Sequence, residues 1–567
     1  MSTPPLQVER PEATFPTLST DQIARIARYG TRRRVRRGEI LFDQGTEGIS
    51  FYVVITGSLE ILRPHKGKED LIVVHHAGQF TGEISLLNGR RSLARARVAE
   101  DGEVLEVPAG ALHTLVQTDS ELSELLMRAF ILRRVSLIKE GLGDVVVIGS
   151  HFSPSTLRVR EFLTRNSHPY KYIDVESDPD AQEFLDKLGV GVEEVPVVIC
   201  RSELVLRNPT LEEVADCLGF NAAIDVGVVR DLLVVGAGPA GLAAAVYAAS
   251  EGLDVLVLET HAPGGQAGSS SKIENYLGFP TGISGQALAG RAFAQAEKFG
   301  ASVAVTRSAA KLLCKKRPFA VQLSTGDVVH ARSVVVASGA QYRKLPLERL
   351  ADFEGAGVYY AASEMEASLC TDKEEVIVVG GGNSAGQAAT FLAGFRKDST
   401  TGELVRRTKH VHMLVRSDGL AASMSRYLID RITESPHITL RTQTEIEALE
   451  GETHLERVRW RNAATGEVGT RPIRHVFSMT GAVPNTVWVG GCLALDDKGF
   501  VKAGPDINAD ELAAAQWPLE RAPYLLETST PGVFVVGDAR AGSVKRVASA
   551  VGEGSICVQL VHKALAE

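Results

Sequence analysis

Cysteine is scarce in this chain of 567 residues, and its six cysteines lie far apart. The sequence contains no Cys-x-x-Cys, although closely paired cysteines are the usual sign of a dithiol centre, a zinc site or a disulfide framework. This spacing predicts no metal site and no disulfide framework, and it favours a reduced, cytoplasmic setting. The cysteines are Cys200, Cys217, Cys314, Cys370, Cys492 and Cys557.

Long apolar runs and a strong excess of one charge are also missing. No run of 18 apolar residues occurs, which predicts no transmembrane helix and no membrane partner, and the first residues lack a signal-peptide pattern. A net charge of −8 argues against nucleic acid as the main partner. The rest is an ordinary globular composition, 44% hydrophobic and 23% charged, in a chain long enough for several domains.

A glycine-rich turn follows the apolar run 232–235, in the order Gly236-x-Gly238-x-x-Gly241. Ala-rich helical sequence comes next, and a second apolar run ends on Glu259. In a dinucleotide-binding βαβ unit such glycines permit the tight turn, the approach to a pyrophosphate and close helix–strand packing, while the acid accepts hydrogen bonds from a ribose. The full pattern predicts a nucleotide site here.

A second copy of this pattern occupies the chain from Glu375 onward. An apolar run meets Gly380-Gly381-Gly382-Asn383-Ser384-Ala385, and the following strand, 411–415, ends on Arg416 with no acid. An arginine in this place can pair with the 2′-phosphate of NADP, whereas a carboxylate favours NAD. Arg406, Arg407 and Lys409 are further cations expected near it. Two such units predict two nucleotides, FAD and NAD(P)H, with NADPH favoured over NADH.

The N-terminal region differs in pattern. Residues 1–18 are Pro-rich and are expected to form a flexible lead-in, and residues 34–108 contain short β-type runs separated by glycine, which predict a small β-roll. A helix is expected over 120–138. Within this region, Phe80–Ser92 resembles the phosphate-binding cassette of cyclic nucleotide-binding domains. The resemblance implies a unit at 19–140.

That resemblance implies an effector site at Gly82, Glu83, Arg91 and Ser92. In the family a Gly-Glu pair opens a short helix that holds ribose and phosphate, and a downstream arginine neutralises the phosphate. Here no proline precedes the arginine, and Arg90 is the alternative to Arg91. Cyclic AMP, cyclic GMP, or no ligand and a purely structural β-roll are the alternatives.

Residues 143–220 resemble the thioredoxin and glutaredoxin folds. The Val195-Pro196 pair matches the family's cis-proline, and Ser153-Pro154-Ser155-Thr156 stands where the family has Cys-Pro-x-Cys. Without thiols this unit cannot exchange disulfides, so we expect a redox-silent scaffold or docking module. Its strands are expected at 145–148, 172–175 and 195–199, and its helices at 154–164, 179–188 and 210–218.

From about Asp231 to its end, the chain resembles the low-molecular-weight thioredoxin reductase family, through loops and strands spread over the whole stretch. The resemblance implies an FAD-binding domain in two parts, 228–345 and 481–567, around an NAD(P)H-binding domain at 346–480, and a homodimer. The FAD residues it implies, with those of the first glycine turn, are Gly236, Gly238, Pro239, Ala240, Gly241, Glu259, Gly264, Gly265, Gln266, Asn275, Ala337, Gly339, Gly537, Asp538, Arg546, Val547 and Ala548. The NAD(P)H residues are Gly380, Gly382, Asn383, Ser384, Ala385, Arg416 and Gly481.

The expected fold class is therefore multidomain: a β-roll, an α/β thioredoxin-like fold and two α/β Rossmann-like domains. The chain departs from the reductase family at Val358–Met365, where the family carries its Cys-x-x-Cys; here the segment has no cysteine, and Cys370 is alone. Hydride transfer from nicotinamide to flavin needs only the orientation of the two rings, so no catalytic side chain is predicted.

Two functions follow from this pattern. The first is an FAD-dependent NAD(P)H oxidoreductase without dithiol chemistry, regulated by its N-terminal domains, whose electrons go to an unassigned protein or small acceptor. The second is a sensor or interaction protein that binds FAD and does not turn over. Reduction of the flavin by NAD(P)H distinguishes them.

Overall fold

A computed structural model describes residues 11–567 except 66–67, 83–85, 87–90, 140–144, 179–184, 186–188, 192–193, 201–203, 221–223 and 399–401. The cassette residue Glu83 therefore lies outside the described residues, and so does the expected helix at 179–188 except for residue 185. None of the helices in the described ranges combines the length and apolar character that a bilayer crossing requires.

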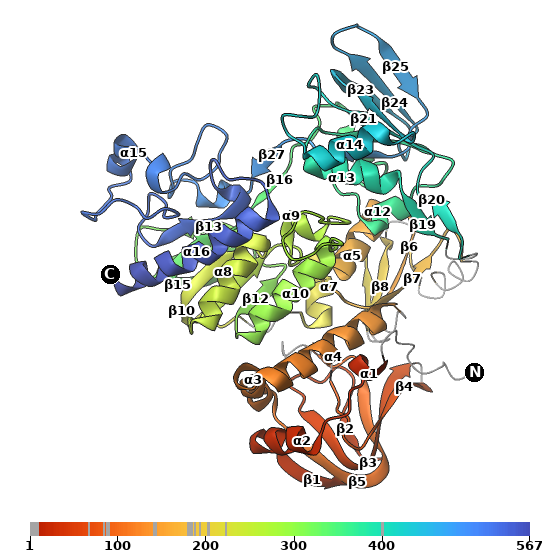
Figure 1. Ribbon diagram of the computed structural model, residues 1–567, viewed down its shortest axis with the longest axis vertical. Coiled ribbons are helices and arrows are strands. Elements are labelled where there is room, and N and C mark those ends of the chain that lie inside the picture. The colour runs from red at the N-terminus through yellow and green to blue at the C-terminus, as the bar shows by residue number, and fades with distance from the viewer. Residues whose placement is uncertain are drawn as a thin grey trace.

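The N-terminal unit is a β-roll with strand order β1-β5-β3-β4, in which β2 also pairs with β5 (Figure 1). Short β-type runs separated by glycine were expected here, but residues on both sides of Gly57 form one strand, β3, because Gly57 with φ +80° lets it bend without ending. The elements are α1 (Pro11–Thr14), α2 (Thr20–Ile26), β1 (Thr31–Val35), β2 (Ile40–Phe42), β3 (Phe51–His65), β4 (Lys68–His76), β5 (Arg95–Val107), α3 (Ala109–Thr118) and α4 (Ser120–Lys139).

The expectation of a flexible lead-in is wrong for residues 11–18. Helix α1 packs against α4, Thr14 and Leu18 are buried, and the Thr14 carbonyl accepts a hydrogen bond from Arg133 Nε at 2.9 Å. A Pro-rich composition suggested poor order, but the two buried side chains and the arginine hold this segment on the roll.

The thioredoxin-type unit is a sheet ordered β7-β6-β8-β9 with helices α5 and α7, and the Val195-Pro196 bond is cis as the resemblance implied. Ser153 caps α5 by accepting a hydrogen bond from the Thr156 N–H, so this hydroxyl acts as a helix cap. The elements are β6 (Val145–Gly149), α5 (Pro154–Arg165), β7 (Tyr170–Asp174), β8 (Val197–Cys200), β9 (Leu204–Arg207) and α7 (Leu211–Leu218).

The FAD-type unit contains a sheet ordered β12-β11-β10-β15-β14-β13, with β28 parallel to β15. Helices α8, α10 and α16 pack against one another and cover one face of it (Figure 1). The elements are β10 (Val229–Val235), α8 (Pro239–Ser250), β11 (Val255–Glu259), α9 (Gly265–Gly268), α10 (Gly285–Lys298), β12 (Ser302–Val305), β13 (Ala309–Leu313), β14 (Phe319–Leu323), β15 (Val328–Val336), α15 (Ala509–Ala514), β28 (Val533–Val535) and α16 (Val547–Ala566).

The NAD(P)H-type unit is a parallel sheet ordered β17-β26-β18-β21-β22 with an antiparallel sheet β23-β24-β25. It joins the FAD-type unit through the paired strands β16 (Ala340–Tyr342) and β27 (Ala482–Pro484). Its elements are α11 (Leu350–Phe353), β17 (Val358–Tyr359), α12 (Glu364–Ser368), β18 (Glu375–Val379), α13 (Asn383–Leu392), β19 (Phe395–Lys397), β20 (Leu404–Arg406), β21 (His410–Leu414), α14 (Arg426–Glu434), β22 (Ile438–Arg441), β23 (Thr444–Glu450), β24 (Arg457–Asn462), β25 (Val468–Arg471) and β26 (Val476–Ser478).

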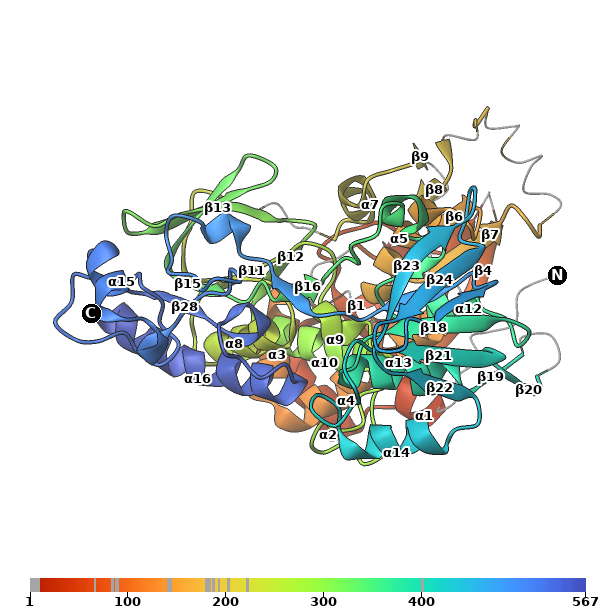
Figure 2. The ribbon, with the colours of Figure 1, turned by 90° about the horizontal axis from the view of Figure 1, so that it is seen from above.

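The units are arranged around the thioredoxin-type unit. Helix α4 lies between the β-roll and the other domains, and the thioredoxin-type sheet lies beside both nucleotide-binding units (Figures 1 and 2). Gln117 in α3 donates a hydrogen bond to the Lys298 carbonyl of α10 at 3.0 Å, so the roll also contacts the FAD-type unit directly.

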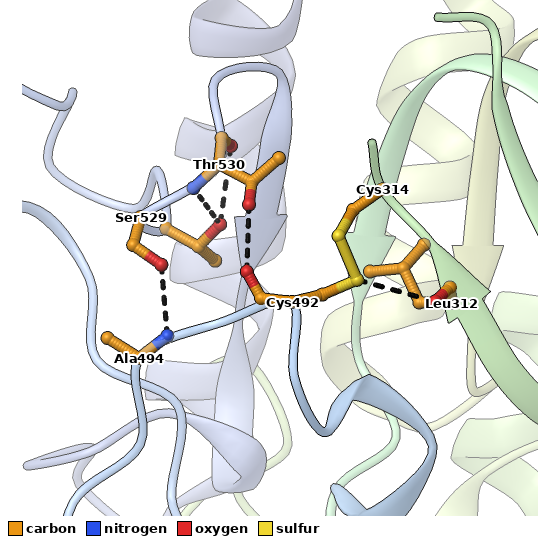
Figure 3. Close-up of a disulfide and its surroundings, with 7 residues drawn as sticks. Leu312, Cys314, Cys492, Ala494, Ser529 and Thr530 are labelled. Carbon is orange, nitrogen blue, oxygen red and sulfur yellow. Dashed lines mark hydrogen bonds between the residues drawn. A yellow bond between two sulfur atoms is a disulfide. The ribbon is translucent and has the colours of Figure 1, made fainter. Parts of the chain in front are cut away.

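The expectation of no disulfides is wrong. Cys200 pairs with Cys217 inside the thioredoxin-type unit, and Cys314 pairs with Cys492 across the FAD-type unit (Figure 3). The paired residues are 17 and 178 positions apart, and sequence spacing does not reveal that a fold brings such distant positions together. Cys370 and Cys557 are buried and free.

Candidate active site

The first glycine turn is shaped by close backbone contacts. Gly236 has φ +107°, and a Cβ there would lie 2.3 Å from the Ala337 carbonyl oxygen. A Cβ on Gly241 would lie 1.8 Å from the Gly236 carbonyl oxygen. Gly238 precedes α8 without a side-chain cap, so its N-terminal N–H groups are left for an anion. Each predicted glycine therefore meets its own steric requirement.

Glu259 ends β11 beside this turn, and Pro239 and Ala240 begin α8 there. The Glu259 carboxylate accepts hydrogen bonds from the Ala237 N–H at 2.7 Å and from the His261 N–H at 2.9 Å. The loop that follows folds back on the turn, because the Gly264 N–H donates to the Ala237 carbonyl at 2.7 Å and Gly265 approaches Gly238. Gln266 follows in α9, whereas Asn275 is exposed further along.

The C-terminal part reaches the same edge of the sheet. Gly537 and Asp538 follow β28, as Ala337 and Gly339 follow β15. Arg546 occupies the N-cap position of α16 without a side-chain capping hydrogen bond, and the helix begins with Val547 and Ala548. The Gly537 N–H donates to Glu553 at 2.7 Å, and Lys545 Nζ donates to the Asp538 carbonyl at 2.7 Å. Burial raises the pKa of the Asp538 carboxyl and lowers that of Lys545.

These segments fit a dinucleotide with a flavin. A helix N-terminus without a side-chain cap can hold a pyrophosphate, a carboxylate at the end of the second strand can hold a ribose, and the half-buried Asp538 can accept a hydrogen bond from a sugar-chain hydroxyl. All three groups lie at the carboxyl ends of adjacent parallel strands, where α/β folds bind ligands.

The second glycine turn repeats this geometry between β18 and α13. Gly380 has φ +138° and faces the Met479 carbonyl, and Gly382 precedes α13 with no neighbour within 4 Å of a Cβ added there. Asn383 accepts a hydrogen bond from the Ser425 N–H at 2.7 Å, and Ala385 is buried. Gly481, which directly precedes β27, has φ +51°. The turn offers a second free helix N-terminus for a phosphate.

Arg416 follows β21, as the coenzyme prediction requires. Its side chain is 74% exposed and its Nε lies 3.7 Å from Glu445, so little holds it in place. The expectation that Arg406, Arg407 and Lys409 stand near it is wrong. These three precede β21, at the other end of the strand, where Arg407 pairs with Glu364 at 2.7 Å and Lys409 lies 3.4 Å from Glu375.

A pocket of about 330 Å³, open to solvent, lies where the FAD-type and NAD(P)H-type units meet. Ser384 contributes to it from the second glycine turn, and Tyr342 from the strand that joins the two units. Burial raises the pKa of the Tyr342 phenol, which is close enough to Asp538 to feel its charge. The lining is neutral: Gln266, Ser269, Ser270, Ser271, Tyr342, Tyr360, Ala361, Ala362, Ser384, Gln387, Ala388 and Met479.

No thiol lines this pocket. Ala361 and Ala362 come from the segment 358–365, where the resemblance to the reductases implies a Cys-x-x-Cys. Cys370 is buried in the apolar core of the NAD(P)H-type unit, and this burial raises the pKa of its thiol. A thiol that is buried and hard to ionise is a poor nucleophile. The pocket therefore offers hydroxyl, amide and aromatic groups, and it has no side chain for a disulfide-exchange step.

The cassette residues that the structure describes are held by protein contacts. Arg91 Nε donates to Glu47 at 2.7 Å, and its side chain lies against Gly219 of the thioredoxin-type unit. The Gly82 carbonyl accepts a hydrogen bond from Arg133 at 2.8 Å, and the Ser92 hydroxyl donates to the Ala94 carbonyl at 2.7 Å. Only Gly82 and Arg91 have geometry that bears on an effector phosphate.

Comparison with protein families agrees with this arrangement. Residues 230–554 match the model of the pyridine nucleotide-disulphide oxidoreductases. The chain belongs to this family. Residues 32–119 match the cyclic nucleotide-binding domain, and residues 145–205 match glutaredoxin. The expected multidomain fold class is confirmed.

Within this oxidoreductase family, the similar proteins are thioredoxin reductases. The thioredoxin reductase of Treponema pallidum is 33% identical over 327 residues, which cover 58% of this chain and 94% of that protein. The NADPH-dependent thioredoxin reductase 3 of Arabidopsis thaliana is 29% identical over 62% of this chain and 63% of that protein. The crystal structure of T. acidophilum thioredoxin reductase has a TM-score of 0.51 and 25% identity, and covers 60% of this chain and 99% of that one.

Several residues at the oxidoreductase site were absent from the sequence predictions. Tyr342, Tyr360 and the serines 269–271 line the pocket. The run of three serines begins three residues after Gln266, and this closeness to a predicted FAD residue was a signal that could have identified it. Tyr342 and Tyr360 come from two different units, and only the packing of those units places them together. Contacts from the thioredoxin-type unit to the loop after Glu259 had no sequence signal at all.

Proposed function

We propose that this protein is an FAD-dependent NAD(P)H oxidoreductase that passes electrons from its flavin to an acceptor without a protein dithiol. The observation that carries the proposal is the pair of glycine turns with uncapped helix N-termini, together with a pocket where the two units meet that is lined by Ser384, Gln266 and Tyr342. One turn suits FAD and the other suits NAD(P)H.

The chain's own residues have binding and positioning tasks in this scheme. The amides of the two helix N-termini bind phosphates, Glu259 and Asp538 accept hydrogen bonds from sugar hydroxyls, and the pocket walls orient the two rings. The bound flavin supplies the hydride chemistry. A reductase of the thioredoxin type would also need a dithiol next to the flavin, and Ala361 and Ala362 occupy that wall instead.

The neutral lining favours an uncharged acceptor over a charged one. Of the pocket residues that the structure describes, the polar ones are all hydroxyls, phenols or amides, which can donate to a carbonyl oxygen. We therefore propose a small quinone-like or carbonyl electrophile that enters the open side of the pocket. A protein acceptor and oxygen are outcomes that the same assay distinguishes.

NADPH is the proposed coenzyme, supported by the position of Arg416 and by the name of the Arabidopsis relative, which describes that protein as NADPH-dependent. Regulation through the β-roll, a homodimer and a cytoplasmic location belong to the same proposal. The sensor hypothesis is favoured by one observation: Arg91, the proposed phosphate partner, contacts Gly219 of the thioredoxin-type unit, so a cassette ligand would act on a domain contact.

Anaerobic flavin reduction tests the proposed function. The holoprotein is mixed with NADPH or with NADH, and the visible flavin absorbance is followed in time. We expect rapid bleaching with NADPH and slower bleaching with NADH. In Arg416→Ala, the NADPH concentration for half-maximal rate should rise about tenfold, since a charge-assisted hydrogen bond contributes about 1.5–3 kcal/mol.

Arg457→Ala is the matched control, because Arg457 is an exposed arginine of the same unit with its own acidic partner, Glu450. NADH kinetics should be the same in both variants. A flavin that neither coenzyme bleaches would contradict the oxidoreductase proposal and support the sensor. Equal effects of NADPH and NADH in the unaltered protein would contradict the coenzyme assignment alone.

A further inference from the structure

The loop from Glu259 to Gly268, which folds back on the first glycine turn, is also held from outside by the thioredoxin-type unit. At the end of α5, Arg165 donates a hydrogen bond to the Gly265 carbonyl at 2.9 Å. The next residue, Asn166, donates to the His261 carbonyl at 3.1 Å. Both acceptors are backbone groups of the loop that carries the predicted FAD residues.

A second set of contacts connects the backbone of Glu259 to the thioredoxin-type unit through Arg307. Arg307 donates through its backbone N–H to the Glu259 carbonyl at 3.0 Å, and its guanidinium pairs with Glu212 of α7 at 2.8 Å. Val305, the last residue of β12, belongs to the apolar core of the thioredoxin-type unit. The two units thus share a core at this edge of the FAD-type sheet.

The segment that makes these contacts has little freedom. Asn166 is 6% exposed and also donates to the Phe162 carbonyl at 2.9 Å, which fixes its side chain on the end of α5. Ser167 has φ +53°, a left-handed conformation that non-glycine residues seldom adopt. The Thr164 carbonyl accepts from Gln286 of α10 at 2.6 Å. Ordered surroundings therefore support an uncommon turn.

Helix α4 of the β-roll holds the same segment from its opposite side. Arg134 is 5% exposed, and its Nε donates to the Ser167 carbonyl at 2.7 Å. The adjacent Arg133 donates to the Gly82 carbonyl, where the cassette begins. Neighbouring arginines of one helix thus contact the cassette and the segment that contacts the loop after Glu259.

We propose that the glutaredoxin-like domain, which has no thiols at its family site, is part of the FAD site, with Arg165 and Asn166 as positioning residues for the loop 259–268. Arg134 acts on the same loop through Ser167. The proposal rests on FAD binding as proposed above. It assigns the redox-silent domain a role in cofactor retention and gives the β-roll a physical connection to the flavin.

FAD release from the full-length holoprotein is the test. Diluted holoprotein is followed by the rise in flavin fluorescence as FAD leaves. Arg165→Ala should release FAD about tenfold faster, since it removes a charged donor from the loop. Arg134→Ala removes a hydrogen bond to Ser167, which does not belong to the FAD-type unit. Because its effect on the loop is indirect, this variant should accelerate release about threefold. Arg165→Lys keeps a charged donor and should restore most of the retention.

Arg158→Ala and Arg128→Ala are the controls, because each removes an exposed arginine from the same helix, α5 and α4 respectively. If Arg165→Ala does not fold, Gln286→Ala gives a milder change, because it removes the donor to the Thr164 carbonyl of the same segment. Release rates equal to the controls in Arg165→Ala, or in Gln286→Ala where Arg165→Ala does not fold, would overturn the proposal. Unaltered protein that binds no FAD would instead contradict the proposed function.

Discussion

The glutaredoxin-like domain and the NAD(P)H-type unit both have other residues where their families place paired thiols, but the surroundings of the two sites differ. In the first, Thr156 is fully buried, Leu157 belongs to the apolar core of the NAD(P)H-type unit, and Phe152 stacks on His454. In the second, Ala361 and Ala362 line an open pocket that also includes Ser384 of the second glycine turn.

The two sites therefore show two different surroundings for residues that stand where a family has paired thiols. A helix N-terminus that packs on a neighbouring unit has become an interface, and new side chains there are selected for packing. The pocket in the second region includes Ser384 of a nucleotide-binding turn in its lining, and hydride transfer between bound nucleotide rings needs no thiol. In the proposed function, the first site therefore acts on structure and the second on chemistry.

The largest effect should come from the first glycine turn. The comparison assigns chemistry to the NAD(P)H-type site, and that chemistry requires FAD bound at this turn. Gly241→Ala places a Cβ 1.8 Å from the Gly236 carbonyl oxygen, and neither group belongs to a flexible side chain. The helix must move from the strand, so bound FAD should fall to about a tenth of normal or less. The ratio of flavin absorbance to protein absorbance after gel filtration measures this.

Gly290→Ala serves as its control, because Gly290 lies in α10 with no atom within 4 Å of an added Cβ. That variant should keep its FAD and be slightly more stable, since alanine favours a helix over glycine. A Gly241→Ala protein with a full complement of FAD would show that the first turn is not the flavin site.

A smaller effect is expected from the two disulfides, of which one lies in the glutaredoxin-like domain and the other in the FAD-type unit. In the chain-entropy description, removing Cys200–Cys217 by alanine substitution lowers the free energy of unfolding by about 3 kcal/mol, and removing Cys314–Cys492 by about 5 kcal/mol, since the second closes a far longer loop. Chemical denaturation of the two double variants gives both values.

The two disulfides should also differ in their accessibility to reductant. Cys314 and Cys492 are half-buried, whereas Cys200 and Cys217 are buried, so alkylation of the folded protein after mild reduction should label the first pair only. Mass spectrometry of the peptides reads this directly. Six free thiols in the protein as purified would contradict both disulfides and agree with the reduced setting that the sequence predicts.

Local patterns predicted the folds of the four units because each unit carries its own repeat of strand, turn and helix. Gly236, Gly238 and Gly241 belong to a strand–turn–helix–strand pattern that spans about 25 residues, so the sequence around them was sufficient to predict the unit. The β-roll was predicted as a fold for the same reason, although Gly57 joined two expected strands into one.

Contacts between distant segments were beyond such patterns. Cys314 and Cys492 meet only because β13 and the segment after β27 pack together, and Arg165 reaches Gly265 only because two domains share a core. The cations 406, 407 and 409 were expected near Arg416 because they are close in sequence, yet a strand between them places them at its opposite end. Tertiary packing decided each of these positions.

The smallest effect tests the interface side of the comparison. A Cβ on Gly355 would lie 2.8 Å from Pro154 Cβ, so Gly355→Ala should loosen the contact between α5 and the NAD(P)H-type unit. Gly355 has φ +78°, and any side chain there also strains the backbone. Gly466→Ala corrects for that strain, since Gly466 has φ +72° with no neighbour within 4 Å of an added Cβ.

The difference between the two variants is the free energy of unfolding that belongs to the contact, and we expect about 1 kcal/mol, the lower end of the cost of overpacking. If the α5 terminus is an interface and nothing more, Gly355→Ala should leave the rate of flavin reduction by NADPH unchanged while thermal unfolding occurs at a lower temperature. A changed reduction rate at equal stability would instead mean that the contact governs how the two nucleotide units face each other, and the glutaredoxin-like site would then act on chemistry as well.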